Sequence, residues 1–205
     1  MRPDEKIDID VFKVVTRAIA HSTSLEAMTA YLSQLLVAAL GVKGCSIFAL
    51  DPGTGELEII GTFGLKARFL SKGPVLSQKS IARTLKGVPV IVSDVEKSKA
   101  LQYPDQTRAE GIRAIVSLPV TLYGQVIGAL RLYHREVWKL SDRDLDSLLV
   151  LAEMIGLAMS YTRLVQGMQA VREAAGDTNM GWLPSRDAGW ARVQKGGKRQ
   201  RRASI

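Results

Sequence analysis

The sequence predicts an α+β domain built on an antiparallel sheet, and three observations support this prediction. Near the N-terminus, apolar residues recur every three or four positions, which indicates helices. From residue 45 the pattern changes to short apolar runs separated by turn sequences, which indicates strands with tight connections. A long apolar and amphipathic segment follows residue 141. Strands that are joined by tight turns pair antiparallel, so the helices are expected to gather onto the sheet.

Two helices are predicted in the N-terminal segment. The first has an apolar stripe that stops at His21 and consists of Val11, Phe12, Val14, Val15, Ala18 and Ile19. The second is expected to begin at Thr23, because Thr23 and Glu26 have the spacing of a capping box. Gly41 stands where a helix C-terminal cap is expected. The apolar face of the second helix consists of Leu25, Met28, Leu32, Leu35, Leu36 and Ala39.

Five strands are predicted from runs at 45–50, 56–63, 88–92, 114–122 and 125–133. Turn residues at 51–55 make the first two runs a hairpin, and Tyr123-Gly124 joins the last two tightly. Pro119 lies inside the fourth run, and because proline cannot donate to a ladder, we expect an edge, a bulge or a corner there. A short helix is predicted at 79–86, and an irregular segment at 94–111.

The last predicted helix is capped by Ser141, with Asp142 and Asp144 placed to complement the helix dipole. Its apolar positions recur at near-heptad spacing, at Leu145, Leu148, Ala152, Ile155, Met159 and Thr162, and Leu149, Leu151 and Leu157 widen this face. One face of such a helix can pack on the sheet while another meets a second chain. We therefore predict a homodimer through the terminal helices.

Composition indicates a soluble, cytoplasmic protein. The chain has 205 residues, of which 46% are hydrophobic, and this is enough for a core. The single cysteine, Cys45, excludes an intrachain disulfide, a Cys-based zinc site and a two-thiol redox cycle. No secretory signal pattern is visible, and the apolar run 148–159 is interrupted by Glu153 and is too short to span a bilayer. We therefore predict no transmembrane segment.

The formal net charge of +8 is concentrated at the C-terminus. Residues 172–205 carry eight basic and three acidic side chains, and from Ala175 onward the composition is typical of a disordered tail. The predicted organisation is an N-terminal extension at 1–10, one domain at 11–166, and a helix end with a basic tail at 167–205. Such a tail can bind nucleic acid or an anionic membrane weakly, but a solvated tail is the simpler interpretation.

Four segments, in order and at fixed spacing, resemble one known family. They are the Gly-x-Pro strand at 87–94, the proline-containing strand at 111–120, the glycine-bounded hairpin segment at 124–130 and the capped helix start at 140–144. From about Val11 to Val165 the chain resembles a GAF domain. The resemblance implies a GAF/PAS-like antiparallel sheet of five or six strands with helices on both faces. It also implies a pocket between the sheet and the segment after the third strand, and a parallel dimer bundle of the outer helices.

GAF domains bind several kinds of small molecule, and three chemistries can be tested on the residues. Bilin attachment needs a cysteine in a loop that corresponds to residues 106–110, where there is none. The cyclic-nucleotide signature is not reproduced at 134–144. Reduction of free methionine sulfoxide needs an attacking and a resolving thiol, and Cys45 cannot supply both. No phosphate-binding loop or nucleophile elbow is present, so we predict no enzyme and no catalytic or metal-binding residue.

A noncovalent pocket remains. The resemblance places its polar residues at Asp94, Tyr103, Arg108 and Arg113, and its apolar ones at Phe63 and Ile115. These groups suit a small polar or anionic ligand whose identity is open. Asp94 and Arg113 could instead only fix the loop. The predicted function is a ligand-sensing regulatory module that signals to a separate output protein. The alternatives are a dimeric scaffold with a degenerate pocket, and weak nucleic-acid binding through the basic tail.

Overall fold

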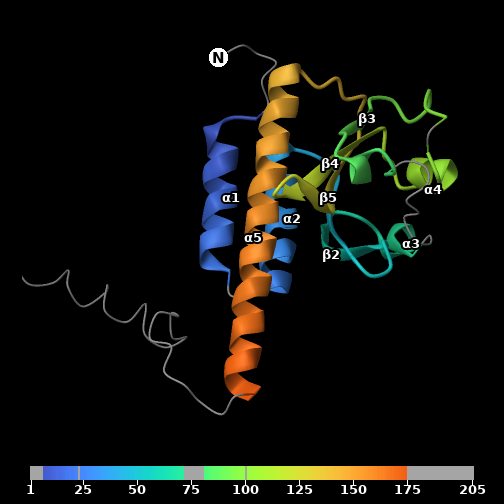
Figure 1. Cartoon of the computed structure of the whole chain (residues 1–205). Coiled ribbons are helices and arrows are strands. Elements are labelled where there is room, and N and C mark those ends of the chain that lie inside the picture. Colours follow the sequence, from blue (N-terminus) through green and yellow to red (C-terminus); the bar gives the residue numbers. More distant parts are fainter. Residues whose placement is uncertain (1–6, 23, 72–80, 100, 175–205) are drawn as a thin grey trace, which may run out of the picture. The chain divides into compact units, whose positions relative to one another are not determined.

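The computed structural model of the chain describes residues 7–22, 24–71, 81–99 and 101–174 (Figure 1). The chain divides into a compact unit, Met1–Val165, and a second unit, Gln166–Ile205. The elements are α1 (Ile9–His21), α2 (Leu25–Leu40), β1 (Gly44–Leu50), β2 (Leu57–Phe63), α3 (Ala67–Leu70), the 3-10 turn η1 (Thr84–Lys86), β3 (Val90–Val92), α4 (Pro104–Ala109), β4 (Ala114–Leu122), β5 (Gln125–His134) and α5 (Asp142–Ala174).

The five strands form one sheet in the order β2-β1-β5-β4-β3, with every neighbouring pair antiparallel. The two predicted hairpins, β1–β2 and β4–β5, are both present. They are joined along β1 and β5, where Gly44 pairs with Tyr133 and Ala49 with Gly128. The predicted α+β class with an antiparallel sheet is confirmed.

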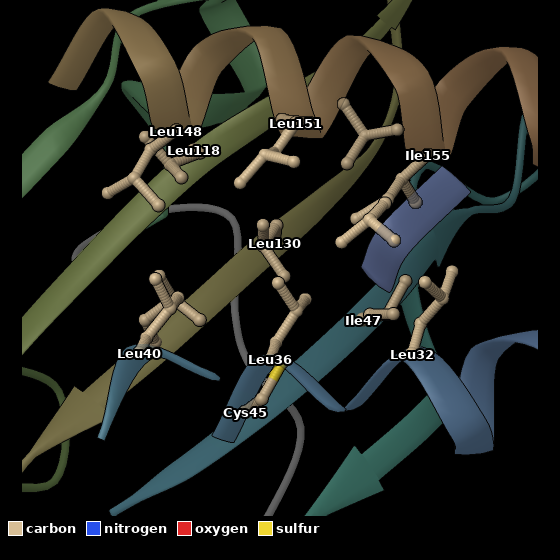
Figure 2. Packing of buried hydrophobic residues seen from close by; sticks show 14 of the residues in the cluster. Leu32, Leu36, Leu40, Cys45, Ile47, Leu118, Leu130, Leu148, Leu151 and Ile155 are labelled. Atoms are coloured by element: carbon tan, nitrogen blue, oxygen red, sulfur yellow. The ribbon is translucent and has the colours of Figure 1, made fainter. Parts of the chain in front are cut away.

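One face of the sheet is covered by α2 and α5, and α1 packs against these helices from the side away from the strands (Figure 1). Alternate residues of the central strands point toward these helices, as expected for a pleated strand. Figure 2 shows this packing, with side chains from α2 and α5 meeting those of the sheet: Leu32, Leu36, Leu40, Cys45, Ile47, Leu118, Leu130, Leu148, Leu151 and Ile155. Each fully buried leucine stabilises the fold by roughly 2 kcal/mol, so this aliphatic layer is the main core.

The opposite face, which we call the distal face, carries α3, η1 and α4 (Figure 1). Two smaller apolar clusters lie there. One consists of Phe69, Val92, Val95, Leu101, Ile112, Ile115 and Tyr133. The other consists of Phe48, Ile81 and Ala129, with Leu57 and Leu85 packed against it. The expectation of helices on both faces is therefore confirmed.

The helix termini confirm some of the predicted caps and correct one. Gly41 has φ +63° and ends α2, and Ser141 Oγ accepts a hydrogen bond from Asp144 N at 3.0 Å. The cap predicted at Thr23 is wrong. The N-cap is Ser24, which has extended backbone angles and accepts from Ala27 N at 3.1 Å, so that Leu25 begins the helix.

Two other elements are shorter than predicted. The strand expected at 88–92 is restricted to Val90–Val92, which pairs with β4 at Ile115–Ser117. The helix expected at 79–86 is present only as the turn η1, and residues 79 and 80 lie outside the described residues, as does the tail from residue 175. Pro119 comes just beyond the last residue that pairs with β3, so the donor it lacks is not needed.

The apolar run in the sequence indicated a shorter helix than the α5 that the structure has. It has 33 residues, and by length and composition alone it could cross a membrane. This corrects the expectation that its apolar part is too short. In the structure one side of α5 packs on the sheet through Leu148, Leu151, Ile155 and Met159, each fully buried. The packing explains much of the apolar character without a bilayer.

Candidate functional site

A row of polar side chains crosses the middle of the distal face. Residues that pair directly across an antiparallel sheet project to the same side. Ser46 on β1 pairs with Thr62 on β2 and with Arg131 on β5, and Arg131 pairs in turn with Ser117 on β4. We call Thr62, Ser46, Arg131 and Ser117 the polar row. Four adjacent strands thus bring together residues that lie up to 85 positions apart in the sequence.

The polar row is internally hydrogen-bonded, and all of its residues except the partly buried Thr62 are buried. Arg131 is only 6% exposed, and Ser46 and Ser117 are 1% exposed. Arg131 Nε donates to Ser117 Oγ at 3.0 Å, and the hydroxyls of Ser46 and Thr62 lie 3.1 Å apart. The Arg131 guanidinium also lies 5.7 Å from the ring centre of Tyr133, within the range of a cation–π contact. A full positive charge is therefore held at the centre of the sheet, away from water.

Apolar side chains border the polar row on both sides along the strands. Ile115 and Tyr133 lie toward one end, and the Tyr133 ring packs edge-on against Phe69 at 5.8 Å. Phe48 and Ala129 lie toward the other end, in contact with Ile81. A charged group with a few hydroxyls between two apolar surfaces is the composition of a small-molecule site.

The segment between β3 and β4 carries a separate set of ion pairs. Arg113 Nη2 lies 3.2 Å from Asp94 Oδ1. Arg108 contacts Glu96 Oε2 at 3.0 Å and Asp105 Oδ1 at 3.1 Å. These pairs connect the loop before α4, α4 itself and the start of β4.

Glu110 forms the most buried ion pair of this segment. Its Oε1 lies 3.1 Å from Lys43 Nζ and accepts from Lys66 N at 3.2 Å. Burial by itself would raise the pKa of the Glu110 carboxyl, but the hydrogen bonds from Lys43 and Lys66 hold the pKa below its usual value. The carboxylate therefore ties β1 and α3 to α4, which fixes the border of the distal face.

The predicted site residues are only partly brought together. Ile115 lies on the distal face beside the polar row, and Asp94 and Arg113 pair with each other at its border. Tyr103 precedes α4 and accepts from Gln102 Nε2 at 3.0 Å. Arg108 is tied to two exposed carboxylates.

Phe63 lies elsewhere. It pairs with Cys45, whose side chain belongs to the core beneath the helices. Phe63 therefore projects from the same helix-covered face as Cys45, not from the distal face, and it is 43% exposed.

The polar row is not among the site residues that the sequence predicted. The sequence feature that indicates it is a charged residue between two apolar ones, Leu130-Arg131-Leu132. The neighbouring residues along this strand are all buried. A serine stands in the same setting between Cys45 and Ile47 on β1.

Cys45 is a core residue. It is fully buried, and burial raises the pKa of its thiol to about 12, which a hydrogen bond with Ser33 opposes only in part. A thiolate is the reactive form of cysteine, so this residue is a poor nucleophile. Within the described ranges, no three His, Cys, Asp or Glu side chains are arranged to hold a metal ion.

The raised pKa of Cys45 predicts a pH-dependent loss of stability. Between pH 9 and about 12 the unfolded chain releases the thiol proton while the folded chain keeps it, so the free energy of unfolding falls as the pH rises. We expect Cys45→Ala to remove about 1 kcal/mol of the loss measured between pH 8 and pH 10 by urea unfolding. The same pH dependence in both proteins would contradict this placement of the thiol.

The chain thus combines a five-stranded antiparallel sheet with three long helices on one side and short helices over a partly polar face on the other. The family model "GAF domain" matches residues 11–159. The chain belongs to the GAF domain family.

Solved structures show the same fold at low sequence identity. The GAF domain of a phosphoenolpyruvate-protein phosphotransferase from Coxiella burnetii is 17% identical, with a TM-score of 0.68 over 78% of this chain and 96% of that one. Free methionine-R-sulfoxide reductase from Neisseria meningitidis is 18% identical, with a TM-score of 0.63 over 75% and 88%. The phycoerythrobilin-bound GAF domain of a cyanobacterial phytochrome is 17% identical, with a TM-score of 0.60 over 77% and 98%. A comparison with curated protein sequences gave no significant match.

Proposed function

We propose that this chain is a cytoplasmic regulatory module that binds a small molecule noncovalently on the distal face and signals to a separate output protein. The observation that carries the proposal is the buried polar row between two apolar clusters. GAF domains are known for small-molecule sensing and regulation, and these side chains provide polar and apolar contacts of the kind such binding requires. We propose that the Asp94–Arg113 ion pair forms the border of this site.

The position of Arg131 on β5 connects the proposed site to the helices. Arg131 lies on the distal face, whereas its neighbours Leu130 and Leu132 project into the core. Figure 2 shows Leu130 beneath α5, in the same layer as Leu151. A ligand that shifts β5 changes this packing, so α5 is the element through which we propose that occupancy is passed on.

The outer face of α5 provides a surface for that signal. Val150, Leu157 and Leu164 recur every seven residues and are all exposed, the last two by more than 60%. Met154 and Tyr161 stand three residues before the last two of these, which gives the alternating spacing of a coiled-coil seam. We call these five residues the outer seam.

Part of the outer seam borders a groove of about 290 Å³ between α1 and α5, lined by Thr16, Ile19, Met154, Leu157, Ala158 and Tyr161. Aliphatic side chains at this spacing are stabilised when a second helix covers them. We propose that the terminal helices form a homodimer here.

A thermal-shift screen tests the sensing function. We expect a compound from a library of metabolites to raise the melting temperature, because a ligand at a hundred times its Kd stabilises the folded state by about 2.7 kcal/mol. If no compound raises the melting temperature and the chain is dimeric, the result favours the scaffold function over the sensing function. The outer seam by itself would support a scaffold.

The ion pair at the border gives a further prediction. Since Arg113 holds Asp94, Arg113→Ala is expected to lower the free energy of unfolding of the unliganded protein by about 1 kcal/mol. Chemical denaturation measures this loss. If the variant has an unchanged unliganded stability but no longer responds to a compound found in the screen, Arg113 contacts the ligand instead of fixing the loop.

A further inference from the structure

The sheet has two edge strands, β2 and β3, at opposite ends of the strand order (Figure 1). An edge strand presents unpaired N–H and C=O groups that another chain can pair with, so natural proteins shorten or cover such edges. β3 is protected in this way. It has three residues, Pro89 directly precedes it, and Trp138 N donates to the Ser93 carbonyl oxygen just after it at 3.1 Å.

β2 lacks these protections. It has seven residues, none of which is proline or lysine. Within the part of the chain that the structure describes, β2 pairs with β1 on one side, and no backbone hydrogen bond joins its other side to another segment. A bulge at Ile60 interrupts the ladder, and there Thr29 Oγ1 of α2 donates to the Ile60 carbonyl oxygen at 2.5 Å. The residues on either side of the bulge keep an outer edge that a further strand can join.

Two apolar side chains of β2 are exposed beside this edge. Ile59 is 38% exposed and lies on the distal face, because it pairs with Phe48. Phe63 is 43% exposed and lies on the helix-covered face, because it pairs with Cys45. The side chains of an added strand alternate between the two faces. Each face of β2 therefore offers such a strand one apolar contact, and contacts of this kind give strand addition its specificity.

The hairpin that contains β2 is acidic, although the whole chain has a net charge of +8. Residues 51–65 include Asp51, Glu56 and Glu58 and no lysine or arginine. Glu56 and Glu58 are exposed, and neither forms an ion pair with another described residue. Two copies of β2 that paired with each other would bring these carboxylates together, which disfavours a second copy of this chain at the edge. The charge is instead complementary to a basic segment.

We infer that the output protein binds along β2, through an extended segment of alternating basic and apolar residues that adds a strand to the sheet. The inference rests on the proposed function, in which this chain signals to a separate protein. Thr62 of β2 belongs to the polar row, and its hydroxyl lies 3.1 Å from that of Ser46. The proposed ligand site and the proposed partner site therefore share one strand, which gives occupancy a second route beside the one through α5.

The experiment uses three short peptides with blocked ends, each as long as β2, and the full chain labelled with ¹⁵N for NMR. The basic peptide alternates lysine and valine, and the acidic peptide has glutamate in place of lysine. The third is the basic peptide with its central valine replaced by proline, which removes a backbone donor. Chemical shifts and hydrogen-exchange rates are measured for the backbone amides of β2 and β3, without a small-molecule ligand.

We expect the basic peptide to shift the amide signals of β2 and to slow their exchange, while those of β3 stay unchanged. The acidic and the proline-containing peptides should bind more weakly. Ile59→Lys should weaken binding of the basic peptide at least about fivefold, because it removes an apolar contact and repels the peptide. Ile91→Lys is the matched control, since Ile91 on β3 is also 38% exposed, and it should leave binding unchanged.

The double variant Glu56→Lys/Glu58→Lys tests the assigned charge. Both positions are exposed, so the fold should tolerate the change, and the acidic peptide should now bind more tightly than the basic one. This variant also decides the question should Ile59→Lys not fold. Equal binding of the basic and acidic peptides to the wild-type chain would overturn the basic character of the partner.

Two further results would overturn the site itself. If the peptides shift the signals of β3 and not those of β2, the partner edge is wrong. If Ile59→Lys changes the oligomeric state in light scattering, a second copy of this chain occupies the edge. When no peptide binds but a compound is found in the thermal-shift screen, only the partner site fails and the sensing function stands. When both experiments are negative, both proposals fail.

Discussion

Replacing Leu157 and Leu164 together by glutamate is expected to convert the proposed homodimer into a monomer. Both side chains are more than 60% exposed on α5, so the substitutions leave the core intact, and both belong to the outer seam. Removing two large aliphatic contacts from each protomer and adding like charges should raise the dimer dissociation constant by at least about a thousandfold. Light scattering over a range of concentrations measures the change.

Tyr31→Glu is the control for this experiment. Tyr31 is half exposed on α2, a helix that contributes no residue to the outer seam, so this variant adds a negative charge at an exposed apolar position outside the proposed seam. We expect it to remain dimeric. A wild-type chain that is monomeric at all concentrations would refute the dimer, and a double variant that stays dimeric would place the interface elsewhere.

Gly156→Ala is expected to destabilise the protein although it improves helix propensity. Alanine in a helix interior is favoured over glycine by about 1 kcal/mol. However, a β-carbon at residue 156 would overlap the backbone carbonyl oxygen of Thr121, near the end of β4, and would also press on Val120. The overlapping atom belongs to the backbone, which cannot move away by changing rotamer as a side chain can. Overpacking of this kind costs about 1–3 kcal/mol. We expect a net loss in the free energy of unfolding, measured by chemical denaturation.

Gly167→Ala on the same helix is the matched control. A β-carbon at residue 167 would meet nothing within 4 Å. The substitution should therefore leave stability unchanged or raise it by up to about 1 kcal/mol. Equal effects of the two substitutions would show that α5 does not approach the β4–β5 hairpin closely at Gly156.

The sequence predicts the elements well because their signals are local. Turn residues at 51–55 and at Tyr123-Gly124 locate both hairpins, and Ser141 and Gly41 act as the expected caps. Thr23 was mistaken for the cap because Ser24, a second residue able to cap, follows it directly. The exposed face of α5 was not separated from its buried face, because residues such as Leu151 and Leu157 are equally apolar in the sequence and differ only in what covers them.

The candidate site is much less predictable. Asp94 and Arg113 could be placed near each other by resemblance to the family, but the polar row depends on which strands are neighbours. Neither the β1 nor the β5 sequence indicates that these two strands are neighbours. The proximity of Ser46, Arg131 and Ser117 therefore follows only from the strand order. Phe63 shows the same limit, because its face of the sheet depends on its pairing with Cys45.

The strand order also constrains how the chain folds during synthesis. Hairpin β1–β2 can form early, but its inner edge is completed only by β5, which leaves the ribosome some 70 residues after β2. Pairing between distant segments forms slowly because the loop between them must first be closed. Until α5 follows, only the helices that precede β1 can cover the apolar side of the sheet, and such incompletely covered intermediates are prone to aggregation. A nascent chain that stops before about residue 160 should therefore depend on chaperones.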